Sequence, residues 1–169
     1  LIAELWDTKN NPFTIWGHIL ISHIMIALPF ATMCMLFAID KWLLLAIFVL
    51  IWINDSGAYL VGSMTAKLPN GNHKMFPRVS PKKSWEGLIG GIVLSIGAGI
   101  LLAYFGWFDF LAENINIYAI GTVFALTVSV FGTIGDLVES LMKRTIGVKD
   151  SGRFLPGHGG ILDRFDSIL

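Results

Sequence analysis

Two pairs of carboxylates, each with a spacing of three residues, are the groups in this sequence best suited to chemistry. Asp136 and Glu139 form the first pair, and Asp163 and Asp166 form the second. Residues three apart project from the same face of a helix, so this spacing brings two carboxylates together. Adjacent carboxylates repel each other unless a cation lies between them. The spacing therefore predicts oxygen ligands for a hard divalent cation such as Mg²⁺.

A glycine-rich turn and several basic residues accompany these carboxylates. In the turn, residues 156–160, Gly159 and Gly160 permit backbone N–H groups to approach a ligand closely. His158 could donate a hydrogen bond to a phosphate or act as an acid or base. Equally, it could simply stabilise the turn. The basic residues nearby are Lys143, Arg144, Lys149, Arg153 and Arg164. Basic side chains and free N–H groups bind phosphate, to which Mg²⁺ can bridge, so these residues predict a metal- and polyphosphate-handling site.

A third group of polar residues lies earlier in the chain. Asp55 interrupts an apolar run, where an ionisable residue is costly and suggests function. The alternative is a buried charge that is paired with a lysine of another span or hydrogen-bonded across the bundle. Lys82 and Lys83, flanked by Ser80 and Ser84, belong to a second basic segment, which an ordinary positive-inside loop would explain.

The composition indicates that a lipid bilayer surrounds these groups. Charged residues make up 14% of the 169 residues and hydrophobic residues 54%, and the mean hydropathy is +0.69. An ordinary globular domain carries about 25% charged residues. So few charges exclude a disordered segment, a coiled coil or a nucleic-acid-binding arm, and we expect no nucleic-acid partner. The single cysteine, Cys34, excludes a disulfide framework within the chain.

Four apolar segments are long enough to cross a bilayer, which takes about 20 residues of helix. They are residues 18–39, 42–62, 85–105 and 117–142. Only Asp40 and Lys41 separate the first two, which predicts an antiparallel helical hairpin, and Pro29 is expected to kink the first span. Glycines of the third span would allow close helix packing: Gly87, Gly90, Gly91, Gly97 and Gly99. The predicted fold class is an all-α integral membrane protein, a polytopic bundle with about four transmembrane helices.

The distribution of charge orients these spans. The loop 63–84 is basic and contains no acid, residues 143–169 are rich in Lys and Arg, and the connection 106–116 carries only acids. The positive-inside rule places both basic segments in the cytoplasm. The predicted organisation is a cytoplasmic segment 1–17, a transmembrane bundle 18–142 with the basic cytoplasmic loop 63–84, and a cytoplasmic segment 143–169 that carries the nucleotide and metal site.

Residues 140–166 closely resemble the signature of the phosphatidate cytidylyltransferases, also called CDP-diacylglycerol synthases. They match the pattern S-x-apolar-K-R-x4-K-D-x-G-x2-apolar-P-x-H-G-G-apolar-x-D-R-apolar-D without a departure. Residues 54–59 (N-D-S-G-A-Y) and 80–87 (S-P-K-K-S-W-E-G) are also similar to the family. The resemblance covers at least residues 50–169. The family has further helices on either side, so we expect this chain to be a piece of a longer protein.

The resemblance implies the reaction of CTP with phosphatidic acid to give CDP-diacylglycerol and pyrophosphate, dependent on Mg²⁺, with a second, monovalent cation left open. The catalytic residues that it implies are Asp136, Asp163, Lys143, Arg144 and Lys149. The implied metal ligands are Asp136 and Asp163, with Asp166 and Glu139 as second candidates. The implied substrate-binding residues are Ser80, Lys82, Lys83, Ser84, His158, Gly159, Gly160, Arg164 and Asp55.

The resemblance also implies a bacterial inner membrane with the active site towards the cytoplasm; a homodimer stays open. Two alternatives compete with this function. One is a CTP-dependent polyprenol or phytol kinase, which transfers the γ-phosphate, and the complete signature argues against it. The other is a transporter with Asp55 and Asp136 on an ion path, which the clustering of carboxylates near one membrane face disfavours.

Overall fold

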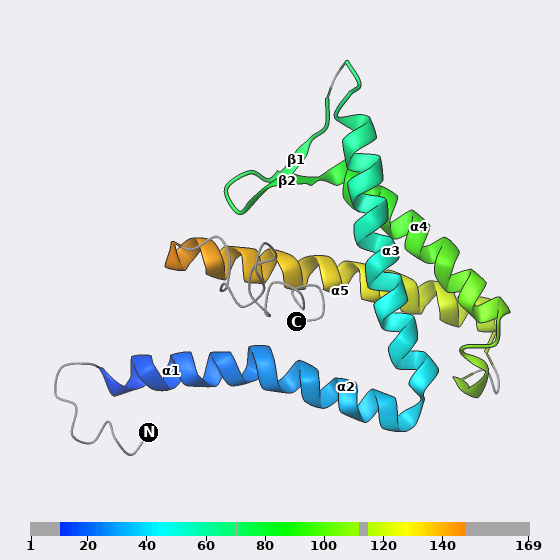
Figure 1. The fold of residues 1–169 in the computed structure, drawn as a ribbon, viewed down its shortest axis with the longest axis horizontal. Coiled ribbons are helices and arrows are strands. Elements are labelled where there is room, and N and C mark those ends of the chain that lie inside the picture. The colour runs from blue at the N-terminus through cyan, green and yellow to red at the C-terminus, as the bar shows by residue number, and fades with distance from the viewer. Residues whose placement is uncertain (1–10, 70, 112–114, 148–169) are drawn as a thin grey trace, which may run out of the picture.

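The structure, a computed structural model, describes residues 11–69, 71–111 and 115–147. Its helices are α1 (Pro12–Ser22), α2 (Leu28–Ile39), α3 (Lys41–Thr65), α4 (Trp85–Tyr104) and α5 (Ile117–Ile146), with a 3-10 turn at Asp109–Leu111 (Figure 1). Among the described residues, α3, α4 and α5 are each long and apolar enough to cross a membrane. The protein is thus an all-α polytopic membrane protein, as predicted, with one small β-hairpin added.

Short polar side chains cap the N-termini of α3 and α5. The Asp40 carboxylate accepts hydrogen bonds from the backbone N–H groups of Trp42 at 2.5 Å and Leu43 at 3.2 Å, which caps α3. Asn116 caps α5 in the same way, and Gly147 ends that helix with a φ of 77°. These contacts satisfy N–H and C=O groups that a helix end leaves free.

The first predicted span is helical but irregular. A π-helical turn, His23–Ala27, joins α1 to α2 just before Pro29. Proline has no N–H, and its ring would collide with the carbonyl four residues earlier, which lies in this turn. A π-helical turn is one way in which a helix accommodates such a break. Because of this turn, the segment does not form one long uninterrupted helix as the other three spans do.

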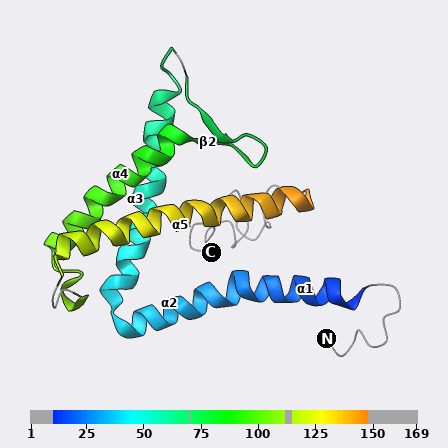
Figure 2. The ribbon, with the colours of Figure 1, turned by 180° about the vertical axis from the view of Figure 1, so that it is seen from behind.

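The antiparallel hairpin expected from the first two spans is wrong. From Asp40, α2 and α3 diverge, and α1 and α2 run beneath α5, roughly along its direction, instead of back along α3 (Figures 1 and 2). The part of the chain that the structure describes buries no residue of α2. The physical reason is the length of the connection, since Asp40 alone separates the two helices. A helical hairpin whose arms pack side by side needs about 2–5 connecting residues.

Helices α3 and α4 form the most extensively packed pair, and glycines allow their close approach. A Cβ added at Gly87 would lie 2.8 Å from the carbonyl oxygen of Ala58, and one added at Gly91 would lie 2.7 Å from that of Asn54. The predicted packing role holds also for Gly90 and Gly99, whereas a Cβ at Gly97 would meet nothing within 4 Å. Small residues at such seams are typical of membrane helices.

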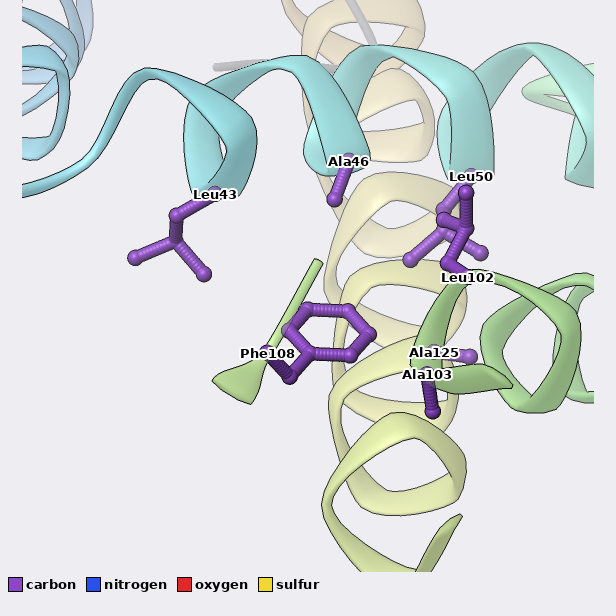
Figure 3. Packing of buried hydrophobic residues seen from close by; sticks show 7 residues of the cluster. All are labelled: Leu43, Ala46, Leu50, Leu102, Ala103, Phe108 and Ala125. Atoms are coloured by element: carbon purple, nitrogen blue, oxygen red, sulfur yellow. The ribbon is translucent and has the colours of Figure 1, made fainter. Parts of the chain in front are cut away.

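The apolar core lies at the end of the bundle where α4 turns into α5. It combines residues of α3, α4, α5 and the α4–α5 connection, namely Leu43, Ala46, Leu50, Leu102, Ala103, Phe108 and Ala125 (Figure 3). A buried hydrogen bond from the Ser95 hydroxyl to the Leu50 carbonyl, 3.2 Å long, joins α3 to α4 beside it. This packing fixes the helices at one end and leaves the other end to the polar residues described below.

A two-stranded antiparallel hairpin occupies the loop between α3 and α4, where the sequence predicted only a basic connection. Its strands are β1 (Lys74–Phe76) and β2 (Ser80–Ser84). The turn is closed by a hydrogen bond from the Val79 N–H to the Phe76 carbonyl, 3.1 Å long. Pro77 follows Phe76, a position in a turn that suits the fixed φ of proline. Figures 1 and 2 show the hairpin projecting over the C-terminal half of α5.

Candidate functional site

A polar pocket of about 240 Å³ lies where α3, α4, α5 and the hairpin meet. The residues that line it are Asn54, Asp55, Ala58, Tyr59, Met75, Lys82, Lys83, Ser84, Gly87, Leu88, Thr133 and Asp136. Five of them, Asp55, Lys82, Lys83, Ser84 and Asp136, were predicted as site residues from the sequence. The fold therefore brings together acidic residues of α3 and α5 and lysines of the hairpin, which are far apart along the chain.

Asp136 and Lys83 form the central interaction of this pocket. The Lys83 Nζ lies 2.5 Å from Asp136 Oδ2, and each side chain retains about a quarter of its exposed surface (25%). The Ser140 hydroxyl, one turn further along α5, donates to Asp136 Oδ1 at 3.2 Å. Both carboxylate oxygens are thus engaged, so the negative charge of Asp136 is matched inside the protein.

Glu139 lies on the same helix but has a different partner. Its Oε1 lies 3.1 Å from the Nζ of Lys143, one turn along α5, and Glu139 is 5% exposed. The sequence suggested that Asp136 and Glu139 require a cation between them. In the structure each carboxylate has its own lysine, and Glu139 does not line the pocket. Arg144 is exposed in the last turn of α5, also outside the pocket lining.

The remaining predicted residues of the basic loop have distinct positions. Lys82 is exposed and lines the pocket. Ser84 is buried, and its hydroxyl accepts a hydrogen bond from the Gly87 N–H at 3.2 Å, so it also caps α4. Ser80 lies at the other end of β2 and does not line the pocket. Asp55 is exposed on α3 and belongs to the lining, as the sequence suggested.

Three polar residues of the pocket were not identified from the sequence. Thr133 precedes Asp136 by three residues on α5, and this spacing alone could have placed it on the same face. Asn54 and Tyr59 flank Asp55 in a stretch that resembles the family, but neither was given a role. Asn54 is 4% exposed, and its Oδ1 accepts no hydrogen bond among the described residues.

An apolar groove of about 410 Å³ adjoins the polar pocket. The hairpin, α4 and α5 line it, and its residues are Met75, Phe76, Val79, Trp85, Leu88, Val130, Thr133, Ile134, Leu137, Val138 and Leu141. Met75, Leu88 and Thr133 line both the groove and the pocket, so the two spaces are direct neighbours. A ligand with a charged head and an apolar tail matches this combination.

The rest of the predicted site lies outside the described residues. It comprises Lys149, His158, Gly159, Gly160, Asp163, Arg164 and Asp166. Within the described residues, no group of three or more His, Cys, Asp or Glu side chains could hold a metal ion. The described part therefore supplies one carboxylate of the predicted metal site to the pocket, Asp136, and the lysines around it.

Comparison with known proteins identifies a family and individual proteins of similar sequence. The chain matches the cytidylyltransferase family over residues 1–169. It is 48% identical over 122 residues to a phosphatidate cytidylyltransferase of Staphylococcus haemolyticus (strain JCSC1435), and 50% identical over 122 residues to one of Staphylococcus aureus (strain COL). Each match covers 72% of this chain and 43% of the relative, so the chain spans less than half the length of these relatives. The chain belongs to the cytidylyltransferase family.

Proposed function

We propose that the full-length protein transfers the cytidylyl group of CTP to phosphatidic acid in a bacterial membrane, giving CDP-diacylglycerol and pyrophosphate. The observation that carries this proposal is a pocket lined by charged residues directly beside an apolar groove, with three lining residues in common. The phosphate monoester of phosphatidic acid needs a charged environment, and its acyl chains need an apolar one. The names of the staphylococcal relatives agree with this substrate.

The reaction places modest demands on the protein. An oxygen of the lipid phosphate attacks the α-phosphorus of CTP, the bond from that phosphorus to the β-phosphate oxygen breaks, and pyrophosphate leaves. The attacking group is already anionic, so no strong general base is required. Catalysis then depends on positioning the reactants and on neutralising their charge. We assign the lipid phosphate to Lys82 and Lys83; the position of both lysines in the lining of the pocket beside the groove supports this assignment.

The residues present fit a Mg²⁺ ion. Mg²⁺ is commonly held by one or two carboxylates together with substrate phosphates. Asp136 offers a carboxylate to the pocket, and Asn54 offers an amide oxygen that has no hydrogen-bond partner among the described residues. Asp136 would hold the ion, with Asp163 and Asp166 as the further predicted ligands. A bound Mg²⁺ supplies positive charge that neutralises the transferring phosphates.

The orientation is part of the same proposal. The hairpin and the last third of α5 lie together, so the basic loop and the basic end of α5 share one end of the molecule. The positive-inside rule then places the pocket at the cytoplasmic surface, where CTP is present.

The test uses the full-length protein in detergent with Mg²⁺, phosphatidic acid and CTP labelled separately at its α and γ phosphates. We expect the α label to enter the lipid and the γ label to leave in pyrophosphate. Entry of the γ label into lipid would establish a kinase, and no transfer would reject both. Asp136→Asn should lower kcat about 100-fold or more, as loss of a transition-state charge contact does. Asp109→Asn, in the α4–α5 connection outside the pocket, is the matched control.

A further inference from the structure

The two pocket lysines lie on an irregular piece of backbone. The paired positions of the hairpin are Lys74 with Ser84 and Phe76 with Ser80. Between these pairs β1 has one residue, whereas β2 has three, residues 81–83. Such a bulge lacks the regular ladder of hydrogen bonds and re-aims the side chains that it carries. The positions of Lys82 and Lys83 therefore depend on how the ends of the bulge are anchored.

Glu86 anchors the end of the hairpin nearer the helices. Its two carboxylate oxygens accept hydrogen bonds from the His73 backbone N–H, at 3.1 Å and 3.0 Å, and its Oε1 lies 2.6 Å from His73 Nδ1. The Trp85 N–H donates to the His73 carbonyl at 3.0 Å, so His73 is held on both sides of its backbone. These contacts are charge-assisted. They are also solvent-exposed, with 81% of the His73 side chain accessible, so the restraint comes from several modest contacts acting on one residue.

The contacts between Glu86 and His73 form a clamp, and this clamp is connected to the packed α3–α4 pair. Glu86 lies in the first turn of α4, where a carboxylate also interacts favourably with the helix dipole. The next residue, Gly87, packs closely against Ala58 of α3. Asn72, which precedes His73, donates from Nδ2 to the Gly62 carbonyl of α3 at 2.9 Å. The base of the hairpin is thus fixed to the packed α3–α4 pair, while Lys83 reaches Asp136 of α5.

We propose that Glu86, through His73, is a positioning residue that holds Lys82 and Lys83 at the pocket. Glu86 does not line the pocket, so it acts on substrate only through the hairpin. The proposal rests on the proposed function in one respect, that the two lysines bind the lipid phosphate. Replacement of Glu86 should then weaken phosphatidic acid binding specifically, since the proposed function assigns the lipid phosphate, and not CTP, to these two lysines.

The kinetic test compares Glu86→Ala, Glu86→Gln and His73→Ala in the full-length protein. We expect Glu86→Ala to raise the KM for phosphatidic acid about tenfold with little change in kcat or in the KM for CTP, the signature of lost ground-state binding. Glu86→Gln keeps an acceptor for the His73 N–H and should recover much of the affinity. His73→Ala keeps the backbone contacts and should have an intermediate effect. An unchanged KM for the lipid, or equal losses with both substrates, would overturn the proposal.

A double-substitution cycle separates positioning from general destabilisation. If Glu86 acts through the lysines, Glu86→Ala should add almost nothing to the KM of a variant in which Lys82 and Lys83 are both alanine. If Glu86→Ala and the two lysine substitutions instead raise the KM independently, so that their factors multiply, the proposal is wrong.

Amide hydrogen exchange provides a readout that does not require activity. Glu86→Ala should speed exchange in residues 74–84 about tenfold and leave residues 120–140 of α5 unchanged. If the wild type transfers no cytidylyl group, the proposed function fails, and this measurement still decides whether Glu86 holds the hairpin. Equal exchange in the wild type and Glu86→Ala would refute the clamp, even in an active enzyme.

Discussion

Replacing Gly91 by alanine tests whether the close α3–α4 contact shapes the pocket. The added Cβ would lie 2.7 Å from the Asn54 carbonyl oxygen and 2.8 Å from its Oδ1, where ordinary contact begins at 3.4 Å. The helices must therefore separate by roughly 0.7 Å, and overpacking of this kind costs about 1–3 kcal/mol. Alanine is a better helix former than glycine by about 1 kcal/mol, which offsets part of this cost.

Gly97→Ala is a matched control on the same helix. A Cβ at Gly97 meets nothing within 4 Å, so only the gain in helix propensity remains. The two variants should differ in free energy of unfolding by about 1–3 kcal/mol, the size of the overpacking term alone. Thermal unfolding of the full-length protein in detergent, followed by circular dichroism, would show Gly91→Ala melting several degrees below Gly97→Ala. Equal melting temperatures would refute the inferred packing, and Gly91→Ala should also lower activity because Asn54 lines the pocket.

Two further predictions concern the cap of α4 and the groove. Ser84→Ala should lower the free energy of unfolding by about 1 kcal/mol, because the Gly87 N–H loses its acceptor. The control Ser80→Ala should change it by less than about 0.5 kcal/mol. Thermal unfolding of the two variants measures this difference. Val138→Trp should fill part of the apolar groove and lower kcat/KM for long-chain phosphatidic acid more than for a dihexanoyl analogue. The control Phe131→Trp, which lies outside the groove, should cause no such difference between the two lipids. Equal losses with both lipids would mean that the groove does not hold acyl chains.

The extents of the membrane helices could be predicted because apolar length is a strong signal in a bilayer. The predicted second and third spans start at residues 42 and 85, and α3 and α4 begin at Lys41 and Trp85. The direction of the chain after Asp40 could not be predicted, because apolar length says nothing about how two helices cross. The hairpin strands were also missed, since three and five residues are too few to show a repeating pattern.

The residue types of the site were easier to predict than their pairing. Asp136 and Lys83 were both identified, but nothing in their separate motifs indicated that they contact each other. Glu86 lies in a stretch that resembles the family, yet its role depends on His73, which belongs to none of the quoted stretches. Tertiary contacts of this kind arise from the close approach of α3, α4 and α5, which the glycine pattern indicated only in general terms.

The ion pair between Lys83 and Asp136 has a consequence for substrate affinity. An anion that binds Lys83 must first displace a carboxylate that is already in place. Under the proposed function, Asp136 would therefore be an internal competitor of the lipid phosphate. Removing that competitor with Asp136→Asn should make the protein bind phosphatidic acid vesicles more tightly, even though the variant turns over slowly or not at all. In binding measured without added metal, weaker retention of the variant than of the wild type would contradict this. A carboxylate that the proposed function requires for turnover would then also limit how firmly the protein holds the lipid.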